Sequence, residues 1–498
     1  MITFIICLTL LVTAYFTYGR FLEKICGIKS DTQVPSKTSY DGVDYIPMPR
    51  WKTFLIQLLN IAGLGPIFGA VLGATYGPVA FLWITLGGIF MGAMHDFVAG
   101  VISLDSNGES LPEIIGKYLG MTTRQVMRLL SVVMMIMVGA VFMLGPAGIL
   151  SSMTGWNANF WLYVVLAYYL LATLLPIDKI IGNIYPIFGG ALIFMALGIL
   201  VVLLTGKYPV PELTTLQNMK LNAEHFPIIP TMFITIACGA ISGFHATQSP
   251  LMARCLKNKK EARSVFYGAM ISESIIALIW AAIAMAFFYD YNGATNGVAG
   301  LNAALAEHNN DASWVVNTIT NTTLGKIGAL LALLGVVAAP ISTGDTAFRS
   351  ARLIIADIIK LDQKSIVKRL YICIPMFIIG FIITLVNYEV LWRYFSWANQ
   401  TLSVFTLWAI TVYLYKKPRT LKQSELQKSD NQKVKGRCNY LISLFPALFM
   451  TFICTLFLFS SNQMVGLQMM SGSLISLGIT ILTLVAVMLH AKNLFSSR

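Results

Sequence analysis

Apolar segments long enough to cross a bilayer recur along almost the whole chain. An α-helix rises about 1.5 Å per residue, so about 20 apolar residues span the hydrocarbon core of a membrane. Thirteen such segments can be marked, at approximately residues 2–19, 53–73, 78–103, 125–150, 158–176, 185–205, 226–246, 264–289, 325–348, 366–387, 390–415, 440–461 and 467–490. We therefore predict an all-α polytopic membrane protein with about thirteen transmembrane helices.

Composition excludes a soluble globular protein. Of the 498 residues, 56% are hydrophobic and only 11% are charged, and the mean hydropathy is +0.72. Such values are typical of helical membrane proteins. The net charge of +13 would suggest a nucleic-acid partner in a soluble protein, but here the basic residues lie in loops between the apolar segments. We therefore expect membrane lipid as a partner and no nucleic acid.

The basic residues also predict how the chain crosses the membrane. If the N-terminus is outside the cell, 31 of the 35 lysines and arginines fall on the cytoplasmic side. This is the asymmetry that membrane proteins show, and one missed or invented helix would remove it. We therefore predict an outer N-terminus and a cytoplasmic C-terminus. No basic residue precedes the first segment and no small-residue cleavage site follows it, so we interpret it as a retained helix.

The second apolar segment is interrupted near its middle. Residues 60–77 read NIAGLGPIFGAVLGATYG, with Gly63, Gly65 and Pro66 at the centre. Glycine and proline weaken helices, so the stretch predicts two half-helices joined by an unwound step. In transporters, such a step holds substrate and coupling ion. The alternative interpretation is a glycine-rich face for close helix packing.

The seventh apolar segment carries a similar interruption. Residues 233–250 read FITIACGAISGFHATQSP, with Gly239, Gly243 and Pro250. The two interruptions lie five segments apart, and because five is odd, two five-helix units would insert with opposite orientations. That is the pattern of an inverted repeat with discontinuous helices at matching places. Chance is the alternative, since glycine is common in membrane helices.

The predicted repeat organises the chain into five parts. They are an N-terminal helix and loop (1–52), the first repeat (53–205), the second repeat (226–415), a basic cytoplasmic linker (416–439) and two C-terminal helices (440–498).

Three carboxylates fall inside apolar segments, where a charge is costly unless it has a partner or a water-filled cavity. Asp96 and Glu273 have no basic residue within a helical turn along their own segments, so we expect them to change protonation more readily. Asp345 lies four residues before Arg349, and this spacing lets the two side chains pair on one helix face. A buried structural pairing is the alternative role for all three carboxylates.

Neutral polar residues in the same segments leave the coupling ion open. His95 and His245 could relay protons, or could be ordinary hydrogen-bonded histidines. Ser342 and Thr343 offer oxygens that suit Na⁺ as well as hydrogen bonds to the helix backbone.

Sequence motifs of metal sites and enzymes are missing. The seven cysteines include no C-x-x-C pair, so we predict free thiols with no disulfide framework and no metal site. Nothing resembles H-E-x-x-H, G-x-S-x-G or a Walker A loop. We therefore expect no catalytic residues, no cofactor besides a coupling ion, and no enzyme activity.

Several motifs occur in order between residues 41 and 400. They are DGVDYIP (41–47), IAGLGPIFG (61–69), HDF (95–97), FITIACGAISGFHA (233–246), GDTAFRSARLIIAD (344–357) and WANQ (397–400). Together they resemble the carbon-starvation (CstA) family. This family contains bacterial inner-membrane transporters linked to peptide uptake and to proton-coupled pyruvate uptake under nutrient limitation. It is grouped with the LeuT-type (amino acid–polyamine–organocation) superfamily, whose fold is a five-plus-five inverted repeat.

The resemblance also implies which residues form the site. The superfamily fold would place substrate between the two interruptions, at Gly63, Gly65, Pro66, Cys238, Gly239, Ser242, Gly243 and His245. It would place a coupling ion between the backbone of the second segment and Ser342 and Thr343. The titratable candidates for ion coupling, taken from the residues themselves, are Asp96, Glu273 and Asp345.

The chain also departs from the family pattern. It has Ile56 and Gln57 where longer family members have a histidine pair, and it lacks the additional helices of those members between the GFHA and GDT motifs.

From these features we expect a secondary active transporter that imports peptides or amino acids, or pyruvate-like carboxylates, by alternating access. Helix N-termini can hold a carboxylate without a basic side chain, which suits a core poor in lysine and arginine. Proton coupling is the expectation, and Na⁺ coupling on the same fold is the alternative. A membrane-embedded enzyme would need a convergent nucleophile and base, and a channel would not need paired interruptions. The sequence does not predict the oligomeric state.

Overall fold

The structure, a computed structural model, confirms an all-α protein. Within the described residues, no strand is present beyond one isolated bridge between Met48 and Leu256. The predicted linker 416–439 lies almost wholly outside these residues. The described residues are 1–28, 33–174, 181–386, 388–416, 439–462 and 464–496.

Most helices are joined by short connections, and a longer one runs over residues 205–227. In chain order they are α1 (Ile2–Phe16), α2 (Tyr18–Ile25), α3 (Pro35–Thr38), α4 (Arg50–Ile61), α5 (Ala70–Ala74), α6 (Val79–Leu82), α7 (Ala93–Asp105), α8 (Leu111–Leu119), α9 (Met121–Thr154), α10 (Ala158–Leu174), α11 (Ile181–Leu204), α12 (Phe233–Thr235), α13 (Gly243–Ala253), α14 (Gly268–Phe287), α15 (Gly297–Glu307), α16 (Ala312–Ile359), α17 (Ile366–Ile383), α18 (Tyr388–Lys416), α20 (Leu441–Ser460) and α21 (Met469–Ser496).

Short π-helical and 3₁₀ segments extend or interrupt these helices. The π-helical segments are η1 (Gly65–Gly69), η2 (Trp83–Gly92), η3 (Ile228–Met232) and η5 (Arg263–Tyr267), and the 3₁₀ turns are η4 (Lys259–Glu261) and η6 (Tyr291–Gly293). Local π-helical turns are frequent at functional sites.

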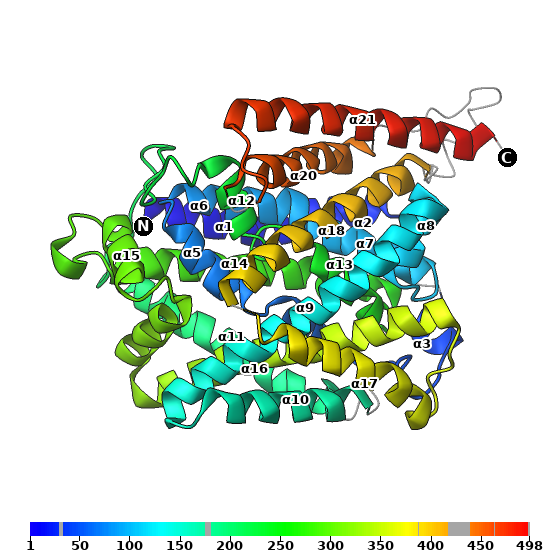
Figure 1. Ribbon diagram of the computed structural model, residues 1–498, viewed down its shortest axis with the longest axis horizontal. Coiled ribbons are helices and arrows are strands. Elements are labelled where there is room, and N and C mark those ends of the chain that lie inside the picture. The colour runs from blue at the N-terminus through cyan, green and yellow to red at the C-terminus, as the bar shows by residue number, and fades with distance from the viewer. Residues whose placement is uncertain (29–32, 175–180, 387, 417–438, 463, 497–498) are drawn as a thin grey trace.

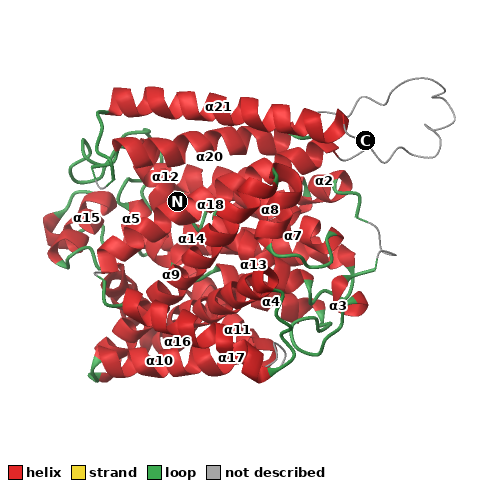
Figure 2. Ribbon diagram, turned by 45° about the vertical axis from the view of Figure 1, so that its right-hand side comes forward, coloured by secondary structure: helices red, strands yellow, loops and turns green. Residues whose placement is uncertain are grey.

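Most of the long helices run side by side along one direction of the molecule (Figure 1). The N-terminus and α15 lie toward one end of this direction, whereas α3, α8 and the C-terminus lie toward the other. Helices α20 and α21 form an outer layer on one side of the bundle, and α10 and α17 lie on the opposite side (Figure 2). The two termini lie at opposite ends of the bundle, which agrees with the predicted topology. Which end faces the cytoplasm stays a prediction.

The described helices make a multi-span membrane protein, but they do not reproduce the predicted count. Eight are long and apolar enough to cross a bilayer, and a ninth crossing results if the bent pair α4 and η1–α5 is taken as one span. The four remaining predicted segments contain α10, the α12–α13 region, α16 and α18, which are not among the eight. Thirteen crossings therefore stay a prediction.

Two of the spans lie deepest in the bundle. The segments Val79–Asp105 and Lys259–Phe287 are each 83% buried, whereas Met469–Asn493 at the edge is only 17% buried. Apolar side chains on the outer spans face the surface, as expected where lipid replaces water. The enclosed centre, which includes α7, α13 and α14, carries buried polar residues such as Asp96, His245 and Glu273.

Candidate functional site

The first predicted interruption is present. Helix α4 ends at Ile61, and the chain resumes as a π-helical turn at Gly65, with the two helical pieces bent by 57°. A Cβ atom added at Gly65 would lie 2.2 Å from the Sγ atom of Cys238. Only glycine permits this approach, so the first interruption lies directly against the second.

The second predicted interruption is present as well. Helix α12 ends at Thr235 and α13 begins at Gly243, with non-helical chain between them. Neighbouring helices satisfy the backbone that is freed there. Trp83 Nε1 donates to the Ile236 carbonyl at 3.0 Å. Asn399 of α18 accepts from the Phe244 amide at 2.7 Å, so α18 caps the start of α13. Buried irregular backbone in a membrane protein requires such partners.

A chain of four buried ionisable side chains crosses the centre of the bundle. Asp96 on α7 shares one hydrogen bond with His95 Nδ1 at 2.8 Å and another with His245 Nδ1, on α13, at 2.9 Å. The other ring nitrogen of His245, Nε2, lies 3.5 Å from Glu273 Oε2 on α14. All four side chains are fully buried. The arrangement therefore places one imidazole between two carboxylates, hydrogen-bonded to Asp96 and 3.5 Å from Glu273.

The polar chain unites residues that the sequence presented separately. The sequence singled out Asp96, His245 and Glu273, and the structure brings these three side chains together. Their pairing was not predicted because the three residues come from three helices, and spacing along one helix reports only i,i+3 and i,i+4 neighbours. Whether they couple an ion to transport stays a prediction.

Cys238 lies beside these buried ionisable side chains. Its sulfur, the Nε2 atom of His245 and a carboxylate oxygen of Glu273 lie within 4.8 Å of one another, and all three residues are buried. Thiol, imidazole and carboxylate groups are common metal ligands, so the described residues do contain a group able to hold a metal ion. This group of ligands could not be predicted from the sequence, because it involves no short metal-binding motif.

The predicted hydroxyl pair lies at the first interruption. Thr343 Oγ1 lies within hydrogen-bond distance of both the Leu59 and Ala339 carbonyls, at 2.8 and 2.9 Å. Ser342 Oγ donates to the Ala339 carbonyl at 2.7 Å. The hydroxyls of α16 thus meet the end of α4, which is the juxtaposition that the resemblance implied. In the present arrangement they donate to the backbone, and ion binding there stays a prediction.

Asp345 and Arg349 each have partners from other parts of the chain. Tyr185 donates its hydroxyl to Asp345 Oδ2 at 2.5 Å. Arg349 contacts Asp44 at 3.0 Å, and Arg352 contacts the same carboxylate at 3.2 Å. Sequence spacing indicated Asp345 for Arg349 but missed Asp44, which lies some 300 residues earlier, between α3 and α4.

The Asp44 carboxylate ties this loop to the end of α16. Burial alone would raise the pKa of Asp44, but the Arg352 and Arg349 guanidinium groups outweigh it and lower the pKa to about 2. Asp44 is therefore ionised throughout the physiological range. A buried carboxylate shared by two guanidinium groups holds α16 against the chain that enters α4.

Gly239 and Gly243 occupy close contacts between helices. A Cβ atom at Gly239 would lie 2.5 Å from the Cβ atom of Ala277, and one at Gly243 would lie 2.3 Å from the amide nitrogen of Ser403. The packing explanation of glycine therefore holds at both positions in this conformation. Their predicted contact with substrate is not tested by this arrangement and stays a prediction.

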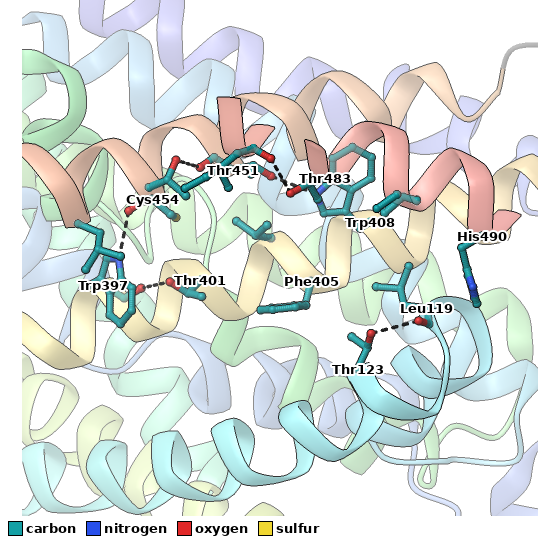
Figure 3. A pocket seen from close by; sticks show the side chains of 16 residues that line it. Leu119, Thr123, Trp397, Thr401, Phe405, Trp408, Thr451, Cys454, Thr483 and His490 are labelled. Carbon is teal, nitrogen blue, oxygen red and sulfur yellow. Dashed lines mark hydrogen bonds between the residues drawn. The ribbon is translucent and has the colours of Figure 1, made fainter. Parts of the chain in front are cut away.

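A groove at the edge of the bundle is separate from the polar chain. It has a volume of about 450 Å³ and lies between α18, α20 and α21 near α8 and α9, as Figure 3 shows. Its indole groups are already satisfied, since Trp397 donates to the Cys454 carbonyl and Trp408 donates to Thr451. None of the residues predicted for substrate or ion lines it.

Known proteins similar to this chain are membrane proteins and transporters. An uncharacterised membrane protein of Haemophilus influenzae is 41% identical over 340 residues, which cover 58% of this chain and 91% of that protein. The peptide transporter CstA of Campylobacter jejuni is 28% identical, and the pyruvate/proton symporter BtsT of Escherichia coli is 26% identical. Each of these matches covers 53% of this chain, and 47% and 46% of the transporters. The chain thus spans about half the length of the named transporters.

A solved structure and a family model complete the comparison. A mutant manganese transporter of Eremococcus coleocola aligns with a TM-score of 0.52 at 13% identity, covering 91% of this chain and 99% of that one. At such low identity the likeness concerns the fold alone. The family model described as "Carbon starvation protein CstA" matches residues 1–153 and 145–327. The chain therefore belongs to the carbon starvation protein CstA family.

Proposed function

We propose that this protein is a proton-coupled secondary active transporter in the inner membrane of a bacterium. It imports small anionic or zwitterionic nutrients, with peptides or amino acids as the first candidates and pyruvate-like carboxylates as the second. The observation that carries the proposal is the buried chain Asp96–His245–Glu273 beside two touching helix interruptions. The relatives named as peptide transporters and as a pyruvate/proton symporter support it.

The polar chain supplies the coupling step. A proton that reaches Glu273 can pass to His245 Nε2, while Asp96 at Nδ1 stabilises the imidazolium that results. Protonation changes the net charge of a water-poor centre, so the loaded and empty states favour different arrangements of the surrounding helices. Alternating access would then rock one five-helix repeat, residues 53–205, against the other, residues 226–415.

A specific observation favours the Na⁺ alternative. Two hydroxyls of α16 and the Leu59 carbonyl converge at the first interruption, and neutral oxygens of this kind are ligands that Na⁺ accepts. A rotation of the hydroxyl groups would turn these donors into acceptors. This second candidate shares the fold and the substrate position with the first, and differs only in the driving ion.

The coupling prediction is tested in proteoliposomes. Glu273→Gln and Asp96→Asn are expected to abolish uptake driven by a pH gradient, because neither amide can exchange a proton. Both variants should keep substrate counterflow, which needs no net proton movement and which also separates a carrier from an enzyme or a channel. The exposed acid Glu224, changed to Gln, is the matched control.

In the same proteoliposomes, uptake driven by an imposed Na⁺ gradient is also measured, with a panel of peptides, amino acids and pyruvate as substrates. If Na⁺ alone drives uptake and both amide variants retain it, the proton hypothesis fails. Ser342 and Thr343 are then the residues to change.

Topology gives an independent prediction. The distribution of basic residues predicts a cytoplasmic C-terminus, and the two termini lie toward opposite ends of the bundle (Figure 1). A reporter enzyme that is active only after export should therefore be inactive when fused to the C-terminus and active when fused to the N-terminus through an added helix-free linker. Export of the C-terminal fusion would contradict the topology.

A further inference from the structure

We propose that Cys238, His245 and Glu273 form a binding site for one divalent transition-metal ion of the Zn²⁺ class. The three ligand atoms lie within 4.8 Å of one another, and the three residues are buried. A thiolate, an imidazole and a carboxylate form a ligand set suited to Zn²⁺ or Co²⁺, whereas Ca²⁺ and Mg²⁺ prefer oxygen ligands alone.

Two of the three ligand residues have unpaired polar atoms, while the Cys238 sulfur contacts the Ser242 hydroxyl at 3.9 Å. His245 Nε2 and both carboxylate oxygens of Glu273 have no hydrogen-bond partner, although His245 Nε2 and Glu273 Oε2 lie only 3.5 Å apart. Buried polar atoms are nearly always satisfied, so an unpaired imidazole nitrogen and an unpaired carboxylate within 4.8 Å of a thiol call for an explanation. A cation bound between the three side chains would pair His245 Nε2 and a Glu273 oxygen at once.

The surroundings of His245 suit a metal ligand. Asp96 Oδ2 lies 2.9 Å from His245 Nδ1, so the proton of a neutral ring is held at Nδ1 and the lone pair of Nε2 faces Cys238 and Glu273. A carboxylate that orients a ligating histidine in this way recurs at metal sites and raises the basicity of the ring. Asp96 is itself held by His95 at 2.8 Å. It therefore acts as a positioning residue rather than as a ligand.

The ligands come from two helices and from the non-helical chain that precedes one of them. Cys238 lies in the non-helical chain between α12 and α13, His245 lies in the first turns of α13, and Glu273 projects from α14. Because one ligand lies in the helix interruption and another just after it, metal binding would fix the local conformation of this stretch. Three protein ligands also leave one tetrahedral position open for water or for an anion. The expectation of no metal site rested only on the absence of closely spaced ligands in the sequence. Ligands that come together from different parts of the chain, as here, are outside that expectation.

The proposal goes beyond the proposed transport function and does not depend on it. Metal binding is measured on purified protein without substrate or membrane gradient, so a failed transport assay leaves the metal result intact. A failed metal assay likewise leaves proton coupling open, since the relay through His245 needs no metal.

The test uses Co²⁺ as a spectroscopic probe. The full-length chain is purified in detergent, stripped with a chelator, incubated with Co²⁺ and passed through a desalting column. We expect one tightly bound Co²⁺ per chain, a near-ultraviolet thiolate-to-cobalt absorption band, and loss of the band when Zn²⁺ is added. Cys238→Ser should abolish the band, and Cys454→Ser, which removes another buried thiol, should leave it unchanged.

Further variants separate ligands from the positioning residue. His245→Gln and Glu273→Gln should lose stoichiometric binding, whereas Asp96→Asn should bind about 10- to 100-fold more weakly and still show the band at saturating Co²⁺. Circular dichroism and size-exclusion chromatography confirm that each variant is folded. Absence of the band in the unmodified chain, or its persistence in folded Cys238→Ser, overturns the proposal.

Discussion

Replacing Asp44 by alanine is expected to destabilise the folded protein by about 3–5 kcal/mol, which is typical when one partner of a buried ion pair is removed. The carboxylate is 2% exposed and contacts both Arg349 and Arg352, which are themselves fully buried. Its loss leaves two guanidinium groups in the interior without this counter-charge. Thermal unfolding of the detergent-solubilised protein measures the effect, and Asp362→Ala, at an exposed acid, is the control.

The pH dependence of this effect has a definite sign. The pKa of Asp44 is lowered to about 2 in the folded protein, below the ordinary value of 3.8. The stability that the carboxylate contributes is therefore fully present above about pH 4, and it is lost as the pH falls toward 2. The difference between the unmodified protein and Asp44→Asn should stay constant between about pH 5 and pH 8. Convergence of the two unfolding curves near neutral pH would show that Asp44 titrates there, contrary to this assignment.

The second large effect is expected at Gly65. A Cβ atom there would lie 2.2 Å from the Cys238 sulfur, so Gly65→Ala forces the two helix interruptions apart. Overpacking of this kind costs about 1–3 kcal/mol, and we expect the displacement to abolish uptake. Gly148→Ala is the control because a Cβ atom at that glycine meets nothing within 4 Å. There, alanine should be neutral or stabilise α9 slightly, since it favours helix more than glycine does.

A double substitution tests the cause of the Gly65 effect. Cys238→Gly removes both atoms that the new methyl group would meet, the sulfur and the Cβ atom. The Gly65→Ala/Cys238→Gly protein should therefore be more stable than the sum of the two single effects predicts. Strict additivity, or Gly65→Ala behaving like Gly148→Ala, would show that the interruptions do not touch as described.

Local sequence signals predicted the helix interruptions well. Clustered glycine and proline act on the backbone where they stand, so IAGLGP and CGAISG indicated both breaks without knowledge of any neighbour. The count of crossings was less accessible. Inside the bundle, neighbouring helices can satisfy short or broken segments such as α12, which need not be long or uniformly apolar.

The site could be predicted residue by residue but not as an arrangement. Asp96, Glu273 and His245 were identifiable because ionisable groups are costly inside a membrane. Their contacts, and the partnership of Asp44 with Arg349, join segments far apart in the chain, and no periodicity reports such distances. Asn399 could be identified only as part of the WANQ motif, because a side chain that caps a distant helix leaves no local sequence pattern.

The cap that Asn399 places on α13 has a consequence for how cargo could drive movement. Its amide oxygen already holds the Phe244 amide at 2.7 Å and the Ser242 hydroxyl at 3.0 Å. A carboxylate that bound to this helix end would have to take the place of Asn399. Because Asn399 belongs to α18, this exchange would break the contact between α18 and α13. In the proposed transporter, the two helices would therefore stay joined without substrate, and substrate binding would separate them.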